Sequence, residues 1–210
     1  MTPAARPTLL SRLVKRILLA LYRWKAWELV QVNPVPPRCV ILGAPHTSNW
    51  DFVFFLGATN QLGIEPNFMG KHSLFRWPMT RFMFDMGGIA VDRSARDRNY
   101  VEQVVGEYAR RERLALVIAP EGTRGAISGW KSGFYHIAHG AGVPIVPAWV
   151  DNATMRGGVG PAIATTGDYA ADLRKIAEFY FSVLPGHPKL GVLYKAVGLI
   201  PADTPEKSHG

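Results

Sequence analysis

The sequence predicts a single α/β domain, with a largely parallel or mixed central sheet flanked by helices, that follows a basic amphipathic helix at the N-terminus. Three observations support this fold class. The chain has 210 residues and is 48% hydrophobic, which is enough to build one large core. Strand-like and helix-like segments alternate from residue 38 onward. Positive charge gathers at the start of the chain, with +5 of the total +8 in residues 1–30.

The composition excludes several protein classes. A chain this apolar, with 19% charged residues, is neither disordered nor fibrous. Cys39 is the single cysteine, so the sequence allows no intrachain disulfide and no Cys-x-x-Cys zinc or redox pair. Nothing in it requires an oxidising compartment, and we expect a cytosolic location.

The first element is a helix in residues 1–33, which form a basic N-terminal arm. On a helical wheel its apolar side chains share one arc of about 140°. They are Leu9, Leu10, Leu13, Val14, Ile17, Ala20, Leu21, Trp24 and Trp27. The basic side chains of Arg12, Lys15, Arg16 and Arg23 lie outside that arc.

An apolar stripe that carries tryptophan, with Lys and Arg on the other face, suits a helix lying in the plane of a membrane interface. The alternative is an ordinary helix packed on the core. A spanning helix is not expected, because the longest uncharged run in the helix, residues 17–22, is far shorter than the roughly 20 residues needed. A signal peptide is not expected either, because Arg23 and Lys25 follow this short apolar run at once.

The second part of the chain, residues 34–210, begins with a proline-rich break at residues 33–37 and carries the alternating pattern. Apolar runs predict strands, and segments with one charged face or longer apolar periodicity predict helices. The expected strands are 38–43, 67–70, 89–91, 114–119, 143–150 and 190–197. The expected helices are 51–62, 74–86, 98–113, 130–139 and 169–181.

Polar clusters that follow strands are the first candidates for a site, because ligands of such sheets bind beyond the carboxyl ends of the strands. Three clusters qualify, and all could face one crevice. They are Pro45-His46-Thr47-Ser48-Asn49-Trp50-Asp51, Gly88-Ile89-Ala90-Val91-Asp92-Arg93 and Pro120-Glu121-Gly122-Thr123-Arg124.

His46 and Asp51 suggest general base chemistry. A neutral imidazole can take a proton from a hydroxyl, and a carboxylate on its other nitrogen fixes the tautomer. On one continuous helix the two side chains would diverge by about 140°. The pair therefore requires His46 in the turn before a helix and Asp51 in its first turn, with Ser48 or Asn49 as the cap. The alternative is that Asp51 only complements the helix dipole.

The third cluster suggests an anion site. Gly122 permits a tight backbone, Thr123 adds a donor, and the planar guanidinium of Arg124 suits phosphate. A structural Arg–Glu pair is the alternative, and Arg93 is ambiguous in the same way. The sequence has no Walker A motif and no Gly-x-Ser-x-Gly nucleophile elbow. His136 and His139 lack a third ligand nearby, so no metal site is expected.

Taken together, these clusters resemble the glycerolipid acyltransferase family, which includes bacterial 1-acylglycerol-3-phosphate acyltransferases. His46 to Asp51 looks like the family's HX4D motif, Gly88 to Arg93 like its second block, and Pro120 to Arg124 like its third. Val143-Pro144-Ile145-Val146-Pro147 resembles the fourth block. The order and spacing fit over residues 38–151, and four blocks in sequence are specific.

The resemblance implies transfer of a fatty acyl group from acyl-CoA or acyl carrier protein to a hydroxyl, with no cofactor. It makes His46 the general base and Asp51 its orienting partner. It makes Arg93, Glu121, Gly122, Thr123 and Arg124 the residues that bind the acceptor phosphate, and it places Lys71 near the thioester oxygen.

The resemblance also implies a lipid-like acceptor and a peripheral or monotopic location on the cytoplasmic face of a membrane, where the arm would dock. The expected acceptor is 1-acylglycerol-3-phosphate. Pro45, Ala119 and Gly125 depart from the usual family residues and leave a lyso-aminolipid or glycolipid acceptor open. A rival from another class is a non-catalytic lipid-binding protein. Nucleic acid is not an expected partner, because residues 31–210 carry only +3.

Overall fold

The computed structural model describes residues 7–91 and 97–200. Their centre is a seven-stranded sheet in the order β1-β7-β6-β2-β5-β3-β4. Neighbouring strands are parallel except for the antiparallel pair β6 and β7, so the predicted mixed α/β sheet is confirmed. The strands are β1 (Glu28–Val32), β2 (Arg38–Gly43), β3 (Pro66–Lys71), β4 (Gly88–Val91), β5 (Leu114–Ile118), β6 (Ile145–Asp151) and β7 (Arg156–Val159).

The register of β2 and β5 decides where the site forms. Both strands are rich in buried aliphatic side chains and lie side by side at the centre of the sheet. Leu42 of β2 is aligned with Ile118 of β5. Because the strands are parallel, the turn that follows each one leaves the same edge of the sheet. His46 and Glu121, which lie shortly after these two positions, are therefore neighbours.

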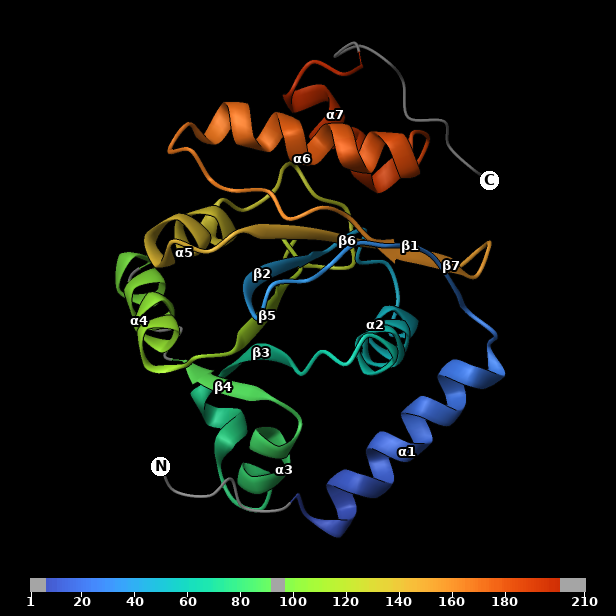
Figure 1. The fold of residues 1–210 in the computed structure, drawn as a ribbon, viewed down its shortest axis with the longest axis vertical. Coiled ribbons are helices and arrows are strands. Elements are labelled where there is room, and N and C mark those ends of the chain that lie inside the picture. The colour runs from blue at the N-terminus through green and yellow to red at the C-terminus, as the bar shows by residue number, and fades with distance from the viewer. Residues whose placement is uncertain (1–6, 92–96, 201–210) are drawn as a thin grey trace.

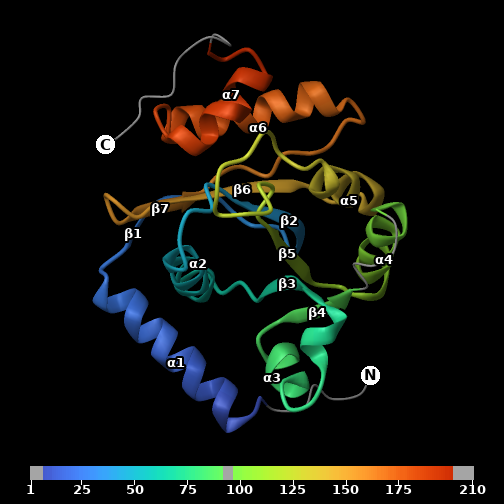
Figure 2. The ribbon, with the colours of Figure 1, turned by 180° about the vertical axis from the view of Figure 1, so that it is seen from behind.

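Helices cover both faces of the sheet (Figures 1 and 2). α2 packs on one face, while α5 and α6 lie on the other, and α1 lies outside α2. Tyr180 of α6 donates a hydrogen bond to the carbonyl oxygens of Leu42 and Ala148, which fastens α6 to β2 and β6. The helices are α1 (Leu9–Trp24), α2 (Trp50–Gln61), α3 (Thr80–Asp85), α4 (Asp97–Arg110), α5 (Gly133–Ala141), α6 (Tyr169–Val183) and α7 (Gly191–Ala196). Two 3-10 turns, η1 (His72–Phe75) and η2 (Pro188–Leu190), complete the elements.

The N-terminal helix α1 packs on α2 through a narrow face. The Tyr22 ring lies directly over Gly57, where an added Cβ would come within 2.1 Å of the ring. Most of the predicted apolar stripe does not take part in this contact and is exposed. The exposed members with large side chains are Leu9, Leu10, Leu13, Ile17 and Trp24, and Trp24 keeps 72% of its surface. The expectation of an amphipathic helix is confirmed, and core packing does not account for its apolar face.

The end of the predicted stripe differs in the structure. The helix ends at Trp24 and the chain then turns at Ala26 (φ 53°) into β1. Trp27 is therefore not on the helix. It is buried, with its ring stacked on Tyr22 at a centroid distance of 5.8 Å. The last residues of the predicted arm thus contribute a strand to the sheet.

Two other predicted elements were wrong. The expected helix 74–86 is divided into η1 and α3, because Pro78 cannot continue a helix from the preceding turn. The expected strand 190–197 is helical, as η2 and α7. Its buried side chains, Leu190, Leu193 and Tyr194, follow the spacing of a helix rather than the alternation of a strand.

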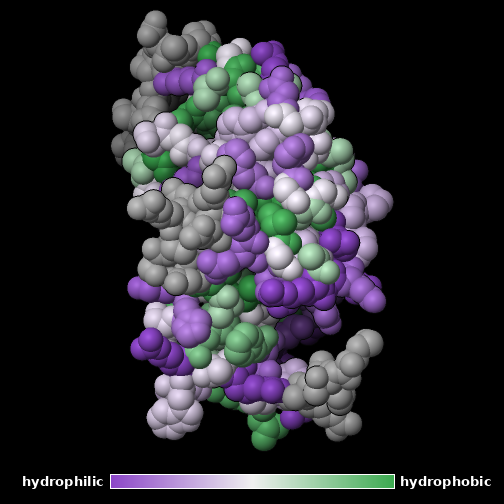
Figure 3. All heavy atoms as spheres, turned by 90° about the vertical axis from the view of Figure 1, so that its left-hand side faces the viewer, coloured by the Kyte–Doolittle hydropathy of each residue, from purple (hydrophilic) through white to green (hydrophobic). Residues whose placement is uncertain are grey.

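The segment from η1 to α3 carries a second group of exposed apolar side chains, and Asp85 joins this segment to α1. The Asp85 carboxylate accepts hydrogen bonds from the Thr8 N–H and the Ser11 hydroxyl, both at 2.8 Å. The exposed group consists of Leu74, Trp77, Met79 and Phe84, and Trp77 keeps 90% of its surface. The face seen from the side of α4 and α5 is different, because hydrophobic residues occur there only in small separate groups (Figure 3). No helix within the described residues is long and apolar enough to cross a membrane.

Candidate active site

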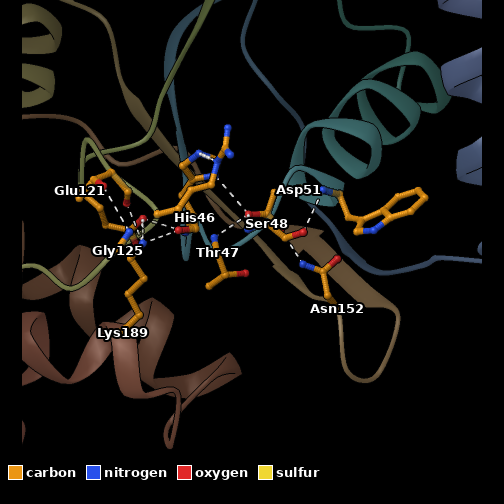
Figure 4. Close-up of polar contacts among 11 residues, drawn as sticks. His46, Thr47, Ser48, Asp51, Glu121, Gly125, Asn152 and Lys189 are labelled. Atoms are coloured by element: carbon orange, nitrogen blue, oxygen red, sulfur yellow. Dashed lines mark hydrogen bonds and ion pairs between the residues drawn. The ribbon is translucent and has the colours of Figure 1, made fainter.

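The site lies where the turns after β2 and β5 meet, beside the first turn of α2 (Figure 4). Asp51 is the second residue of α2 and its side chain reaches back over the preceding turn. Its Oδ2 atom accepts the backbone N–H groups of Thr47 at 2.6 Å and Ser48 at 2.7 Å. Of the two predicted caps, Ser48 accepts the N–H of Trp50 with its hydroxyl at 3.1 Å, whereas Asn49, at the N-cap position, makes no side-chain capping bond.

The HX4D spacing brings the imidazole and the carboxylate together. His46 lies in the turn, and its Nδ1 atom is 3.1 Å from Oδ2 of Asp51. This is the arrangement that the sequence required if the two residues were to act as a pair. Asn152, at the end of β6, donates to Oδ1 of Asp51 at 2.6 Å and holds the carboxylate from the other side.

Asp51 and Arg124 indicate the same ring nitrogen of His46 as the one that carries the proton. The Arg124 Nε–H lies 3.4 Å from Nε2 of His46. A guanidinium can only donate, so Nε2 accepts and the ring proton lies on Nδ1, where it is donated to Asp51. The neutral ring therefore presents a lone pair on Nε2, the atom that faces away from the carboxylate. This tautomer is the one that a general base requires.

The hydrogen bonds around Asp51 keep it ionised. Burial acts to raise the pKa of this carboxyl group, but the bonds from His46, Ser48, Asn152 and Thr47 outweigh burial and lower the pKa below its ordinary value. Asp51 thus carries its negative charge throughout the neutral range. A fixed charge at this place stabilises an imidazolium if His46 takes up a proton.

Glu121 has a different environment from the one expected of a substrate ligand. Its side chain is fully buried, and Oε2 accepts the backbone N–H of His46 at 2.7 Å. Burial raises the pKa of Glu121 above its ordinary value, although the His46 N–H and the charge of Lys189 act against this shift. Glu121 therefore binds the main chain of His46 from the protein interior, and its side chain is not exposed to solvent.

The other predicted residues divide between the site and its surroundings. Gly122 has φ 69°, and a Cβ added there would come within 2.9 Å of Nζ of Lys131. Thr123 accepts the N–H of Gly125 with its hydroxyl at 3.2 Å, which closes the loop that carries Arg124.

Lys71 is exposed at the end of β3, two strands away from β2, and no hydrogen bond or ion pair between described residues joins it to His46. Arg93 lies outside the described residues.

Sequence reasoning missed three residues that the fold brings to the site. Asn152 directly follows a buried strand, which is the signal that singled out the other clusters. Lys131 lies next to the start of α5 and lines the same cavity as His46. Lys189 comes from η2, about 140 positions along the chain from His46, and its Nζ is 2.7 Å from the carbonyl oxygen of Thr123. The local sequence around Lys189 gives no sign of this contact.

Two cavities adjoin His46. The first has a volume of about 150 Å³ and is almost entirely apolar, with walls from Phe52, Phe55, Val117 and Trp149. The second is larger, about 520 Å³, and lies toward α5, with Met69, Phe134 and Lys131 among its lining residues. His46 thus lines both an apolar cavity and a larger one that has the cation of Lys131 among its lining residues.

Comparison with known proteins agrees with this geometry. Residues 29–151 match the family model described as Acyltransferase. Proteins named 1-acyl-sn-glycerol-3-phosphate acyltransferase from Salmonella typhimurium and Escherichia coli are 32% identical over 119 residues. That stretch is 54% of this chain and 47% of each relative, so the match spans about half of their length. A probable 1-acyl-sn-glycerol-3-phosphate acyltransferase from Mycoplasma pneumoniae is 30% identical over 148 residues, which are 67% of this chain and 56% of the relative.

The family model covers more than half of the chain, and its match contains His46, Asp51, Glu121 and the loop of Arg124. The chain therefore belongs to the glycerolipid acyltransferase family.

Proposed function

We propose that this protein transfers a fatty acyl group from an acyl thioester to a hydroxyl of a lysophospholipid-type acceptor at a membrane surface. The observation that carries this proposal is the polarised ring of His46. Its Nδ1–H points to the ionised Asp51, and its basic Nε2 faces a guanidinium beside an apolar cavity. The proposed donor is acyl-CoA or acyl carrier protein, and the transfer needs no cofactor.

The proposed reaction begins when Nε2 of His46 takes the proton of the acceptor hydroxyl. The oxygen attacks the thioester carbonyl carbon, and the carbonyl electrons move onto its oxygen. When the tetrahedral intermediate collapses, the carbon–sulfur bond breaks and the leaving sulfur takes the proton from His46. Asp51 stabilises the imidazolium between these two steps. The products are the ester and a free thiol.

Arg124 supports a phosphate-bearing acceptor. Its bond to Nε2 is long at 3.4 Å and its side chain is exposed, so an acceptor hydroxyl can replace it at that nitrogen. The displaced guanidinium would then stand beside the acceptor, where it can bind a phosphate through two N–H groups. Lys131 adds a second positive charge at the edge of the larger cavity. The relatives' names make 1-acylglycerol-3-phosphate the proposed acceptor.

The apolar surfaces support a lipid substrate and a membrane-bound enzyme. The cavity at His46 offers aromatic and aliphatic walls that suit an acyl chain. The exposed stripe of α1 and the exposed residues near Trp77 suit an interface, and the basic side chains of α1 complement anionic lipid. We propose a peripheral or monotopic location on the cytoplasmic face.

The test is release of free thiol from palmitoyl-CoA by the purified protein in mixed micelles, with and without lysophosphatidic acid. Release that depends on this acceptor is the expected result. Release with a lyso-aminolipid or glycolipid but not with lysophosphatidic acid would reject the proposed acceptor and keep the reaction. If no free thiol is released with any acceptor, from either palmitoyl-CoA or palmitoyl-acyl carrier protein, the non-catalytic lipid-binding alternative is favoured.

Replacement of Asp51 by asparagine should lower kcat by about 10²-fold, because a neutral amide stabilises the imidazolium less than the carboxylate does. The amide oxygen is expected to take the place of Oδ2, which accepts the backbone N–H groups of Thr47 and Ser48, so the ring proton of His46 should stay on Nδ1. The tautomer is checked by ¹⁵N NMR of the His46 ring, in parallel with the thiol assay. An Asp51→Asn protein with the kcat of the wild type would contradict the proposed role.

A further inference from the structure

Lys189 reaches the active site from a part of the chain that lies beyond the region matched by the family model. It is the middle residue of η2, and the neighbouring Leu190 is fully buried in the core and anchors the turn. The Lys189 side chain is only 9% exposed, and its ammonium group lies under the turns that carry His46 and Arg124 (Figure 4).

The ammonium group of Lys189 has three protein partners. It donates to the carbonyl oxygen of His46 and, at 2.7 Å, to the carbonyl oxygen of Thr123. Its third neighbour, Oε2 of Glu121 at 3.6 Å, is an ion-pair partner beyond hydrogen-bond distance. These contacts direct the ammonium group to the two turns, and Lys189 lines neither of the cavities at His46.

The contacts of Lys189 and Glu121 meet on the main chain of His46. Oε2 of Glu121 accepts the N–H of His46 at 2.7 Å, and Lys189 donates to the carbonyl oxygen of the same residue. The buried ion pair therefore holds the backbone of His46 on both sides. Through the Thr123 carbonyl, Lys189 also holds the loop whose next residue is Arg124. One side chain thus links the two turns that place Nε2 opposite the guanidinium.

We propose that Lys189 is a positioning residue that sets the separation of the His46 turn from the Arg124 turn and so aims Nε2 of His46 at the reacting hydroxyl. Its effect on catalysis rests on the proposed acyl transfer, whereas its effect on the His46 ring does not. A displacement of about 1 Å between reacting groups can cost about 10²-fold in rate. Loss of the ammonium group is therefore expected to act on kcat rather than on binding of the acceptor.

The test compares Lys189→Met, Glu121→Gln and the double variant with the wild type. Lys189→Met keeps most of the volume of the side chain and removes its charge and donors. Lys195→Met is the matched control, because Lys195 belongs to the neighbouring α7, is partly exposed and has no polar contact to the site residues that the structure describes. Each protein is measured by the thiol assay, by ¹⁵N NMR of the histidine rings and by urea unfolding. The His46 signals are identified by their absence in His46→Ala.

Lys189→Met is expected to lower kcat by about 10- to 100-fold and to change the acceptor KM by less than about threefold. The His46 ring signals should shift, because the ring loses its fixed orientation. The single variant also leaves Glu121 as a buried, unpaired charge, so its unfolding equilibrium constant should rise by about 10²-fold. The double variant has no charge at either position and should recover much of this stability without recovering kcat. Lys195→Met should behave like the wild type.

Three results would overturn the proposal. The first is a Lys189→Met protein whose His46 signals match those of the wild type. The second is an increase in acceptor KM at unchanged kcat, which would make Lys189 a binding residue. The third is recovery of both stability and kcat in the double variant, which would leave only a structural role. If the wild type transfers no acyl group at all, the NMR spectra alone decide, so failure of the proposed function and failure of this inference remain distinguishable.

Discussion

We expect the His46→Ala variant to lose acceptor-dependent thiol release by about 10³-fold or more. The substitution removes the nitrogen that takes the hydroxyl proton and later returns it to the leaving sulfur. It also leaves Asp51 with one hydrogen-bond donor fewer, but the N–H groups of Thr47 and Ser48 and the amide of Asn152 still stabilise the carboxylate. The fold should therefore survive, and the loss should appear in kcat.

The measurement is thiol release from palmitoyl-CoA with lysophosphatidic acid, or with whichever acceptor the wild type uses. His136→Ala is the matched control, because His136 is exposed on α5 and lines neither of the two cavities at His46. The His136→Ala control should have the activity of the wild type. Its circular dichroism spectrum should be the same as that of His46→Ala, which shows that both variants are folded alike. If His46→Ala and His136→Ala are equally active, His46 is not the base.

Local sequence was sufficient to predict the contact between His46 and Asp51. At their spacing, His46 and Asp51 can contact each other in one geometry, with His46 in a turn and Asp51 in the first turn of the helix that follows. The structure has that geometry. The contact of His46 with Glu121 and Arg124 depends on more than spacing. It requires β2 and β5 to be neighbours, which the sequence suggested only through the rule that ligands gather at the carboxyl ends of strands.

Residues that reach the site through long-range packing could not be predicted. Lys189 directly precedes segment 190–197, which was expected to be a strand because a short apolar run does not by itself distinguish a strand from a buried helix. The short strand β7 was missed because Gly157 and Gly158 have low strand propensity. Glycine is nevertheless needed in this strand, because a larger residue would not fit: a Cβ at Gly157 would come within 2.2 Å of the Phe54 ring. Both cases depend on tertiary contacts that the local sequence does not encode.

The sequence left two interpretations of the N-terminal helix open, and the structure bears on one of them, the packing of the apolar stripe on the core. A helix that used its apolar stripe to pack on the core would bury that stripe, yet Leu13, Ile17 and Trp24 are exposed. The helix is attached to the body by other residues, with Tyr22 on α2 and the Thr8 and Ser11 groups on Asp85. An exposed stripe on a firmly attached helix is a surface that a bilayer could cover without any change of fold.

Replacement of the exposed stripe is accordingly expected to weaken vesicle binding by about 10³-fold. The variant changes four exposed side chains to glutamine: Leu10, Leu13, Ile17 and Trp24. Each keeps half or more of its surface free in the structure. Covering that remaining surface is worth about 1 kcal/mol per side chain, or about 4 kcal/mol for the set. The contacts of Tyr22 and Ser11 are untouched, so the helix should remain docked on the protein.

Flotation with liposomes of phosphatidylcholine, with or without an anionic lipid, measures this binding. A matched variant that changes Arg12, Lys15 and Arg16 to glutamine keeps the stripe and removes three charges from the other face. It should lose affinity for anionic vesicles by about 1 kcal/mol per charge and bind neutral vesicles like the wild type. The stripe variant should lose affinity for both kinds of vesicle. If the stripe variant floats with the vesicles as the wild type does, α1 is not the membrane contact, and the exposed group near Trp77 becomes the surface to test.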